Sequence, residues 1–499
     1  MKRMALVSAS LLALLALPAA QAMAEGKHLT VVHYSPPRAG WAMESIDAYV
    51  MTRFGCIETL TKYDGDNRLV PGLAESWSQS GDTTWDFRLR PNVKFQDGAP
   101  FNADAVVAAL NHVLNVPTPS RSLGPKTVSK VEALDASTVR ITTPKPSQLL
   151  PYRMAAPSAG ILSPAAYGKT INVFGTCTGP FRFASEVPKQ SLAIVRNDDY
   201  WGDKAKIEKV DVRWVIDAGT RVAQLRSGEA DLVMEVPVSL AYGLNADKSK
   251  AVSAEPIPRI QTMIFNHQRK PFDNPLVRRA IQAALDVTAI SEGVYEGYAE
   301  PASGPFAPGQ PWRPDIKPVA QDLDKAKALL AEAGVDPATL KIDMPVYNDR
   351  PDLPDIALVI QQQLQALGIT VNLRVANYAG IEPDLIDGKF DISFLSRNPL
   401  TDMADPSAYL ASDYGCGGSQ NFSKFCDKAF DEALAVASNA ATEQERYAGY
   451  EKLGRRLEEE AIAVFVVHPK QIDAHSAKLK NFKTDPLGYK LLTTEMDIE

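Results

Sequence analysis

In residues 341–377 the spacing of apolar residues changes from the period of a strand to that of a helix and back. This change constrains the fold more than any other feature of the sequence. KIDMPVYN (341–348) has the apolar alternation of a strand, IALVIQQQLQALG (356–368) has the period of a helix, and ITVNLRVAN (369–377) returns to a strand. A strand, a helix and a second strand in this order form a β–α–β unit. Such units place helices against a sheet, so the pattern predicts an α/β fold.

Strand and helix patterns alternate along the rest of the chain, as the same fold class requires. We predict strands at 29–35, 84–90, 137–143, 210–216 and 231–236, and helices at 219–228, 274–285 and 322–334. The Pro-rich stretch 301–314 is either a long ordered loop or a linker. We favour the loop, because regular structure resumes directly after it.

The stretch VKFQDGAPFNADAVVAALNHVL (93–114) predicts a local unit of strand, turn and helix. A short apolar strand ends at Phe95, and Asp97-Gly98 forms the turn. Asn102 can cap the following helix, and Asp104 lies in its first turn, where the helix dipole favours a negative charge. No side chain in the stretch provides chemistry unaided, so we interpret it as structural.

The N-terminus has the layout of a secretory signal peptide. Lys2 and Arg3 form a positive start, 5–17 is an apolar run, and Ala-Met-Ala at 22–24 is a small-x-small cleavage signal. The run is shorter than the ~20 residues that a membrane-spanning helix needs, so a membrane anchor is the less favoured reading. We expect a mature chain that begins near Glu25 and is periplasmic.

The length and the net charge of the chain restrict the class of protein to which it can belong. A mature chain of about 475 residues has room for two or three domains. Without Lys2 and Arg3 the formal net charge of −7 becomes −9. No basic tract with interleaved aromatic residues points to a nucleic-acid partner.

Four cysteines remain in this exported chain, and disulfides are usual in that setting. Cys416 and Cys426 flank the polar stretch GGSQNFSKF, which closes easily into a loop, so we predict a bridge between them. In the chain-entropy description such a bridge stabilises the fold by roughly 2–3 kcal/mol. Cys56 and Cys177 are then left either to pair or to stay free.

The sequence lacks the common signatures of catalysis. No two of its six histidines form a His-x-x-x-His pair, and no Cys-x-x-Cys motif is present, so a protein-built zinc site is not indicated. YGKT (167–170) ends like a phosphate-binding loop, but Ser163 occupies the first glycine position. No Gly-x-Ser-x-Gly elbow is present either. The pattern does not favour an enzyme.

One polar segment, SRNPLTDMADP (396–406), follows directly after the apolar strand at 391–395. In α/β proteins ligands bind beyond the carboxyl ends of strands, so this is the position of a binding loop. Arg397 and Asp402 place opposite charges five residues apart in it. Two readings stay open: a surface salt bridge worth ~0–1 kcal/mol, or a pair that binds ligand.

Several stretches occur together in a recognisable order. Two of them are TWDFRLRPNVKFQDGAPFNADAVVAAL (84–110) and IFNHQRKPFDNPLVRRAIQAALD (264–286). The others lie at 56–80, 175–183, 195–202, 216–233 and 322–335. Together they resemble the family 5 extracellular solute-binding proteins of ABC importers, the peptide- and nickel-binding group. Cys177 departs from the Gly-Thr-Gly-Pro-like stretch of the family, which favours a disulfide found in a subset of members.

The resemblance implies an α/β, two-lobed periplasmic binding protein (Venus-flytrap) fold of the large peptide-binding-protein type, with the ligand cleft between the lobes. Residues 1–24 would be the signal peptide. Lobe one would comprise 25–264 plus 478–499, with an extra subdomain around 60–165, and lobe two would comprise 265–477. Closure around the ligand would shift a population of open and closed forms, and an ABC permease in the inner membrane would read the closed shape.

The resemblance also implies ligand contacts. Asp402, in DMADP, stands where peptide-binding members place the Asp that receives the peptide α-amine, and Arg397 would hold a ligand carboxylate. Asn398 begins an Asn-Pro-Leu stretch that replaces the tryptophan common in this loop, a pattern closer to certain nickel- or metallophore-binding members. Tyr347, at the end of the strand 341–348, is a weaker candidate whose ordinary reading is a strand-end residue.

From this resemblance we expect a binding protein that captures short peptides or peptide-like ligands. The alternative ligand is nickel or a nickel-metallophore chelate. No cofactor is implied, and nickel would enter only as part of a chelated ligand. The protein would be a monomer and no enzyme. The rival classes are a secreted hydrolase, which the missing nucleophile–base signature disfavours, and a receptor that presents ligand to a sensor kinase.

Asp402→Ala should weaken ligand binding by more than about 10-fold, which corresponds to ~1.4 kcal/mol. The variant removes the carboxylate that the resemblance assigns to the ligand's ammonium group. Isothermal titration of the native protein and the variant measures the change. Unchanged affinity would show that the Asp402 carboxylate does not bind the ligand.

Overall fold

A computed structural model describes residues 26–64, 67–120, 122–350, 352–401 and 403–499. The predicted signal peptide 1–24 and the candidate ligand residue Asp402 lie outside the described residues. Helices and strands alternate along the described part, which contains one large mixed sheet and several smaller ones. The predicted α/β class is therefore confirmed.

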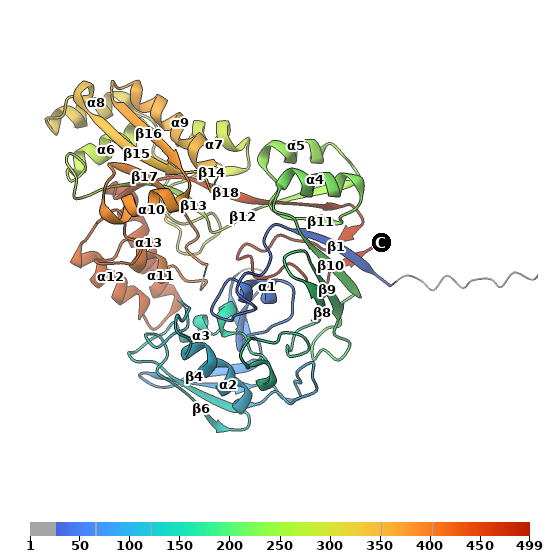
Figure 1. The fold of residues 1–499 in the computed structure, drawn as a ribbon. Helices are drawn as coiled ribbons and strands as arrows, with labels where there is room; N and C mark the ends of the chain where they lie inside the picture. The colour runs from blue at the N-terminus through green and yellow to red at the C-terminus, as the bar shows by residue number, and fades with distance from the viewer. Residues whose placement is uncertain (1–25, 65–66, 121, 351, 402) are drawn as a thin grey trace, which may run out of the picture.

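A ten-stranded sheet crosses the upper part of the molecule in Figure 1. In order along the sheet, its strands are β17 (Ile392–Arg397), β13 (Ile260–Phe265), β18 (Ala463–Ser476), β11 (Leu232–Val233), β1 (His28–His33), β10 (Lys209–Trp214), β9 (Ser191–Arg196) and β8 (Phe181–Val187). Two further strands, β12 (Lys250–Pro256) and β14 (Ala299–Pro301), also pair with β18.

β18 joins the two ends of this sheet. Its first half pairs antiparallel with β13 and β14, and its second half pairs with β11 and β12. β12 and β13 therefore lie along one strand, separated by the short connection 257–259. β18 begins in the apolar run 461–467 and continues through polar residues to Ser476, because partners on both sides satisfy its backbone.

The lobe boundaries at residues 264 and 477 stay predictions, and lobe one and lobe two denote these predicted ranges. The C-terminal tail contacts α1 (Asp47–Arg53) of the lobe-one range: Leu491 and Leu492 donate backbone hydrogen bonds to the carbonyl of Arg53. Lobe one also contains α4 (Ala218–Ser227), α5 (Val238–Asn245), β19 (Leu479–Lys480) and β20 (Asp497–Ile498).

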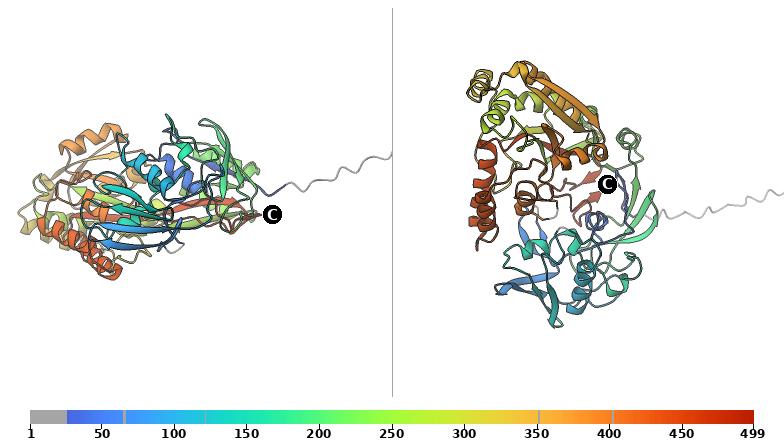
Figure 2. Two further views of the ribbon diagram at one scale, coloured as in Figure 1. Left: turned by 90° about the horizontal axis from the view of Figure 1, so that it is seen from below. Right: turned by 60° about the vertical axis from the view of Figure 1, so that its left-hand side comes forward.

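The subdomain expected around 60–165 contains a four-stranded antiparallel sheet, seen at the bottom of Figure 1 and of the right view of Figure 2. The sheet order is β4 (Ala74–Gly81), β5 (Thr84–Leu89), β7 (Thr138–Thr142) and β6 (Lys130–Asp135). Its neighbours are β2 (Thr61–Tyr63), β3 (Leu69–Pro71), α2 (Ala103–Leu114), α3 (Leu150–Arg153) and the 3₁₀ turns η1 (Pro157–Ala159) and η2 (Pro164–Ala166).

Within this subdomain the predicted helix cap is confirmed and the predicted strand is wrong. The Asn102 side chain accepts a hydrogen bond from the Ala105 N–H at the start of α2. Residues 93–95 form no ladder beyond the single bridge between Lys94 and Pro100. The backbone N–H of Phe95 instead donates to the carbonyl of Ala99, so the chain turns back on itself before an extended strand can form.

Lobe two contains the predicted β–α–β unit, in which β15 (Lys341–Tyr347) and β16 (Thr370–Ala376) pair in parallel. The connecting helix α9 (Asp352–Gln365) begins four residues earlier than predicted, because Asp352 and Asp355 suit the positive end of the helix dipole. The other elements are α6 (Pro275–Ala284), α7 (Val287–Tyr295), α8 (Leu323–Glu332), η3 (Pro337–Thr339), α10 (Tyr378–Asp387), α11 (Ser407–Asp413), α12 (Lys428–Ser438) and α13 (Glu443–Glu459).

The Pro-rich stretch 301–314 is an ordered loop and not a linker. Ala302, Phe306 and Trp312 are buried in one apolar cluster with residues of both lobes, including Tyr63 and Tyr152 of lobe one. A linker with so many buried side chains would not be free to move. The loop therefore belongs to the packed interior near the junction of the lobes.

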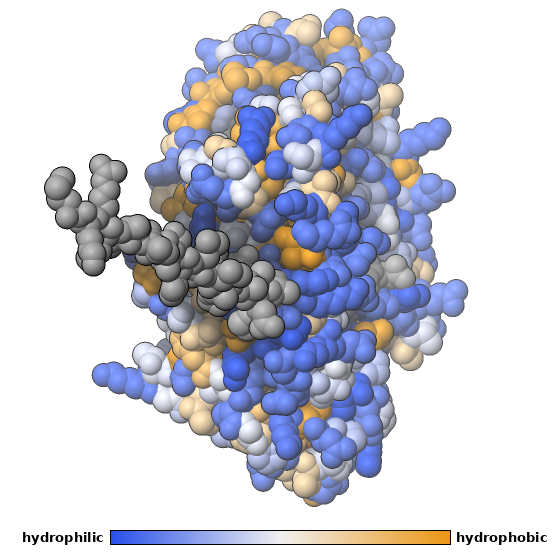
Figure 3. Space-filling view, turned by 90° about the vertical axis from the view of Figure 1, so that its right-hand side faces the viewer, coloured by the Kyte–Doolittle hydropathy of each residue, from blue (hydrophilic) through white to orange (hydrophobic). Residues whose placement is uncertain are grey.

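No helix among the described residues is long and apolar enough to cross a membrane. The face of the molecule in Figure 3 is mostly hydrophilic, with hydrophobic residues scattered across it. Scattered apolar side chains of this kind are normal on a protein surface and need no partner.

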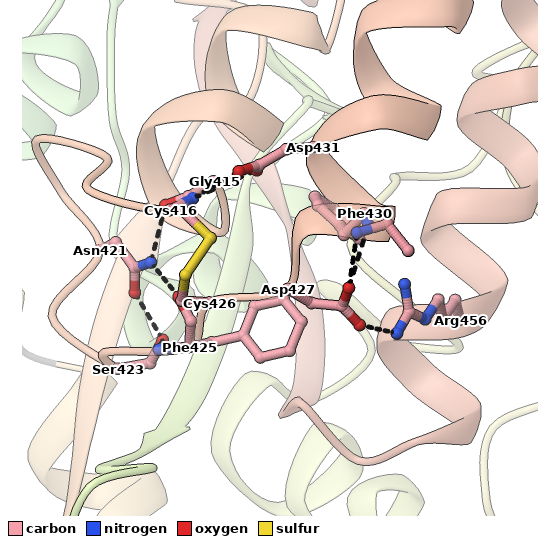
Figure 4. Close-up of a disulfide and its surroundings, with 11 residues drawn as sticks. Gly415, Cys416, Asn421, Ser423, Phe425, Cys426, Asp427, Phe430, Asp431 and Arg456 are labelled. Carbon is pink, nitrogen blue, oxygen red and sulfur yellow. Dashed lines mark hydrogen bonds and ion pairs between the residues drawn. A yellow bond between two sulfur atoms is a disulfide. The ribbon is translucent and has the colours of Figure 1, made fainter.

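Both disulfide pairings are present, Cys56 with Cys177 and Cys416 with Cys426. The loop closed by Cys416–Cys426 is ordered from within (Figure 4). The side-chain amide of Asn421 donates to the carbonyls of Gly415 and Phe425, at 2.9 and 2.6 Å. The Cys416 N–H also donates to the Asp431 carboxylate, which attaches the loop to α12.

Replacing Cys56 and Cys177 by alanine should lower the free energy of unfolding by about 5 kcal/mol, and replacing Cys416 and Cys426 by about 3 kcal/mol. The two bridges span sequence separations of 121 and 10 residues, so the first removes more freedom from the unfolded chain. Urea unfolding of the two double variants measures both losses. A larger loss for the shorter loop would contradict this order.

Candidate functional site

A cavity of about 560 Å³ lies between the two lobes. This volume falls in the range of about 300–1,000 Å³ that is typical of small-molecule sites. One wall comes from the lobe-one subdomain through Ser122, Lys126 and Arg153. The other comes from Arg259, from the 396–403 stretch, from α11, and from Ser419 and Gln420 of the disulfide loop.

Arg397 stands at the carboxyl end of β17 and lines this cavity. Its Nε donates to the Oδ1 of Asp413 at 2.6 Å, and its Nη2 donates to the Oε1 of Gln420 at 3.3 Å. The Arg397 side chain is 19% exposed and the Asp413 side chain 8% exposed. Within the described residues Arg397 therefore forms a largely buried ion pair with Asp413. The salt bridge with Asp402 that one reading expects involves a residue outside the described ranges and stays a prediction.

The surroundings of Arg397 stabilise the positive charge of its guanidinium. Burial opposes the charged form, but the Asp413 carboxylate outweighs this effect and raises the pKa of Arg397 above its usual value. The guanidinium carbon also lies 5.8 Å from the centre of the Phe422 ring. A fixed, charged guanidinium at a cavity wall is suited to a ligand carboxylate, because its planar set of donors matches the two carboxylate oxygens.

Arg259 places a second guanidinium beside the first. Ile260 is the β13 partner of Arg397 across the sheet, and the Nη1 of Arg259 donates to the Oγ of Ser396 at 3.2 Å. In the described chain no carboxylate forms an ion pair with Arg259. Burial and the neighbouring charge of Arg350 lower the pKa of Arg259 from its usual value. The two guanidinium groups line the same cavity. Asp413 compensates the charge of Arg397, and the carboxylates of Glu235 and Asp352 act on Arg259.

Asn398 lines the cavity and shapes the loop after β17. Its side-chain oxygen accepts a hydrogen bond from the Leu400 N–H at 3.0 Å, and its carbonyl accepts one from the Thr401 hydroxyl at 3.1 Å. These bonds close a turn of the kind that asparagine favours. Thr401 and Met403, on either side of the undescribed Asp402, both line the cavity.

Tyr347 lies behind the cavity wall and is not among the lining residues. Its hydroxyl accepts a hydrogen bond from the Ser396 N–H at 2.8 Å, and its ring packs edge-on against Tyr378. Tyr347 therefore holds the end of β17, next to Arg397. Its direct contact with ligand stays a prediction, as do those of Arg397, Asn398 and Asp402.

The structure offers no ready metal centre in the part of the chain that it describes. No group of three or more His, Cys, Asp or Glu side chains is arranged to hold a metal ion there. His468 lies near the cavity, but its Nδ1 donates to the carbonyl of Arg259 at 2.9 Å, and burial lowers its pKa to about 4.

The family described as "Bacterial extracellular solute-binding proteins, family 5 Middle" matches residues 68–421, more than half of the sequence. The chain belongs to this family. Its members are solute-binding components of ABC importers and not enzymes, and they work with membrane permeases. This match confirms the predicted family and its two-lobed fold. It also confirms the prediction that the chain is a binding protein and not an enzyme.

Known relatives of this family 5 protein bind different solutes. The glutathione-binding protein GsiB of Pectobacterium atrosepticum is 30% identical over 440 residues and 85% of each chain. Di/tripeptide-binding protein 2 of Pseudomonas aeruginosa is 28% identical, over 85% of this chain and 86% of the relative. The crystal structure of NikA from Staphylococcus aureus in complex with Ni(L-His)₂ matches with a TM-score of 0.76 and 26% identity, over 95% and 100% of the two chains.

In this family 5 protein, tyrosines of lobe one hold the loop after β17. The Tyr489 hydroxyl donates to the carbonyl of Thr401 at 3.0 Å, and Tyr49 donates to the same carbonyl. The Tyr63 hydroxyl accepts from the Ala404 N–H at 3.1 Å and donates to the carbonyl of Tyr152, also at 3.1 Å. The loop that lines the cavity is therefore also a contact between the lobes.

A second contact joins the lobes at α3 and α13. The Tyr152 hydroxyl accepts a hydrogen bond from the Nη2 of Arg446 at 2.7 Å and donates one to the Glu443 carboxylate. The Arg446 guanidinium also lies over the Tyr152 ring, 5.0 Å from its centre. The structure thus represents the family 5 protein with its lobes in contact around the cavity.

The sequence analysis did not find the cavity residues that lobe one contributes, nor the partner of Arg397 in α11. Lys126 and Arg153 lie more than 240 residues before Arg397, and no local motif marks them. Arg259 follows a Pro-Ile-Pro stretch that reads only as a connection. Asp413 falls in a helix, 16 residues after Arg397, with nothing in the spacing to pair the two. Only the folding of distant segments around one cleft brings these residues together.

Tyr63→Phe should weaken ligand binding by about 2- to 10-fold, because a net hydrogen bond contributes about 0.5–1.5 kcal/mol and this one joins the lobes. The variant keeps the ring and removes the hydroxyl that bonds Ala404 and Tyr152. Titration gives the affinity, and small-angle scattering gives the radius of gyration, which should increase as the open form gains population.

Tyr200→Phe is the matched control for this change. The Tyr200 hydroxyl donates to the Glu58 carboxylate at 2.9 Å, and both residues belong to lobe one. This control should leave the radius of gyration unchanged. If Tyr63→Phe matches the native protein in both measurements, the tyrosine contacts do not contribute to closure.

Proposed function

We propose that this protein is the periplasmic substrate-binding component of an ABC importer and captures short peptides or peptide-like ligands. The observation that carries the proposal is the cavity between the lobes, with Arg397 fixed at its wall by Asp413. The layout of residues 1–24 supports export by a cleaved signal peptide into the periplasm. The named ligands of two relatives, di/tripeptides and glutathione, are of this chemical kind.

Each end of a peptide has a matching charge in this proposal. Arg397, with Arg259 beside it, would bind the carboxylate, and Asp402 would bind the α-ammonium group. The carboxylate and ammonium groups lose water on entering the cavity, so each needs an opposite charge to offset that cost. The volume of about 560 Å³ limits the ligand to a few residues.

Closure would follow from contacts on both walls. A ligand favours the closed form only by as much as it binds that form more tightly than the open one. Arg153 on lobe one and Arg397 on lobe two line the same cavity, so a ligand can touch both only when the lobes meet. The permease would then select the closed, loaded protein.

A nickel chelate is the second candidate ligand. The described residues hold no metal-binding cluster, so nickel would arrive already coordinated by an organic chelator. Such chelators carry carboxylates, which the cavity guanidiniums suit equally well. The complex of the relative from Staphylococcus aureus with Ni(L-His)₂ supports this alternative.

Native mass spectrometry of the protein purified from periplasm without refolding tests the proposal. We expect a bound mass that matches a peptide of a few residues. Arg397→Gln, purified in the same way, should lose this mass, because the variant lacks the carboxylate anchor. Arg374→Gln is the control, since Arg374 pairs with Asp384 elsewhere in lobe two.

Two results would change the assignment. A bound mass with a nickel isotope pattern and a small organic chelator would replace peptide uptake by metal acquisition. Retention of a peptide by Arg397→Gln, in a variant with the native melting temperature, would show that Arg397 is not the anchor.

A further inference from the structure

A second hollow, of about 460 Å³, lies between the lobes beside the first cavity, which Arg397 lines. Arg153 and Ala408 line both spaces, so the two spaces meet at these residues. On the α11 side of this boundary Ala408 presents only a methyl group. Part of a ligand that is bound in the first cavity can therefore extend past Ala408 into the second hollow.

Both lobes contribute apolar side chains to the second hollow. Leu149 of lobe one and Leu434 of α12 line it, and both are buried in the apolar cluster that joins the lobes. Ala411 adds a methyl group from α11. The residues that line the hollow from α12 share one face of this helix: Asp431, Leu434, Ala435 and Ser438. The second hollow thus offers an apolar surface to a side chain with a long hydrocarbon stem.

Asp431 is the one carboxylate that lines the second hollow within the ranges that the structure describes. Its two oxygens accept the backbone N–H of Cys416 at 3.1 and 3.3 Å (Figure 4). Cys416 is itself bonded to Cys426, so this partner of the carboxylate is held in place. Asp431 is half-buried, and among the described residues no cation forms an ion pair with it.

We propose that the second hollow receives one side chain of the bound peptide, and that this side chain is long and positively charged, as in lysine or arginine. The inference rests on the proposed function and adds a side-chain subsite to it. The hydrocarbon stem would pack against Leu149 and Leu434, and the charged end would pair with Asp431.

The charges at the two spaces suit such a ligand. The Nη1 of Arg153 donates to the carbonyl of Ser122 at 3.2 Å, and Ser122 lines the first cavity but not the second hollow. This bond holds the Arg153 guanidinium toward the space that would contain the ligand carboxylate. Asp431 lines the second hollow alone, so a cationic side chain there faces a negative charge.

The openness of the second hollow also favours a charged side chain. It is more open to solvent than the first cavity. A lysine or arginine can therefore bury its stem while its charged end keeps part of its water, which limits the cost of desolvation. A neutral side chain of the same length would pack equally well but leave Asp431 without an ion-pair partner, and an acidic one would be repelled by it.

Tripeptides that differ in one side chain test the inference. The probes are Ala-Ala-Ala and its variants with lysine or methionine at each of the three positions, titrated into the protein after bound ligand has been removed. Lysine and methionine have stems of similar length, so the comparison isolates the charge. We expect a lysine peptide to bind about 3- to 10-fold tighter than the methionine peptide of the same position at low salt, and the ratio to fall as salt screens the charges.

Asp431→Asn tests the carboxylate. The variant keeps an oxygen that can accept the Cys416 N–H but removes the charge. It should abolish the preference for lysine over methionine and bind Ala-Ala-Ala as the native protein does. Glu432→Gln is the matched control, because Glu432 is exposed on the same helix and does not line the second hollow.

Ala435→Lys tests the space itself. Ala435 is exposed and lines the second hollow four residues after Asp431, so the new side chain can pair with this carboxylate along α12 without disturbing the fold. The variant should lose the lysine preference and keep its affinity for Ala-Ala-Ala. Ala433→Lys is the control with the same charge, because Ala433 is exposed on α12 but does not line the second hollow.

The outcomes separate this inference from the proposed function. Equal affinity for the lysine and methionine peptides at every position would overturn the charged subsite and leave peptide capture standing. A lysine preference that survives either Asp431→Asn or Ala435→Lys would overturn its assignment to the second hollow. Binding of none of the peptides would overturn peptide capture, and the side-chain subsite would fall with it.

Discussion

The antiparallel pairing of β18 with strands of both lobes is the constraint on which the rest of the structure depends. A single strand of 14 residues carries β13 and β14 on its first half and β11 and β12 on its second. Because backbone hydrogen bonds run along the whole strand, the two lobes share one sheet. Arg259 lies in the short connection between β12 and β13 and lines the cavity, directly beside this shared sheet.

The cavity lies beside this shared sheet, and charged side chains line it. Tyr49, Tyr63 and Tyr489 of lobe one hold the loop that follows β17, and the same loop lines the ligand space. The guanidinium groups of Arg153 and Arg397 reach the cavity from the two lobes. Hydrogen bonds of the tyrosines, together with the charged contact of Arg446 and Glu443 with Tyr152, thus mark where the lobes meet.

Local features could be predicted from the sequence, and distant ones could not. The β15–α9–β16 unit and the Asn102 cap depend on neighbours within a few residues, so hydrophobic period and side-chain type are enough. The strand expected to end at Phe95 fails because a tight turn captures its backbone. Arg397 was found at the end of its strand, but its partner Asp413 and the opposing Lys126 and Arg153 depend on tertiary packing, which no local spacing encodes.

The disulfide between Cys416 and Cys426 has a consequence for the wall of the cavity. Ser419 and Gln420 lie inside the loop that it closes, and Gln420 bonds the guanidinium of Arg397. Gln420 therefore reaches the Arg397 guanidinium from a segment whose two ends are tied together covalently. A bond that lies outside β17 thus restricts how far this part of the cavity wall can move away from Arg397.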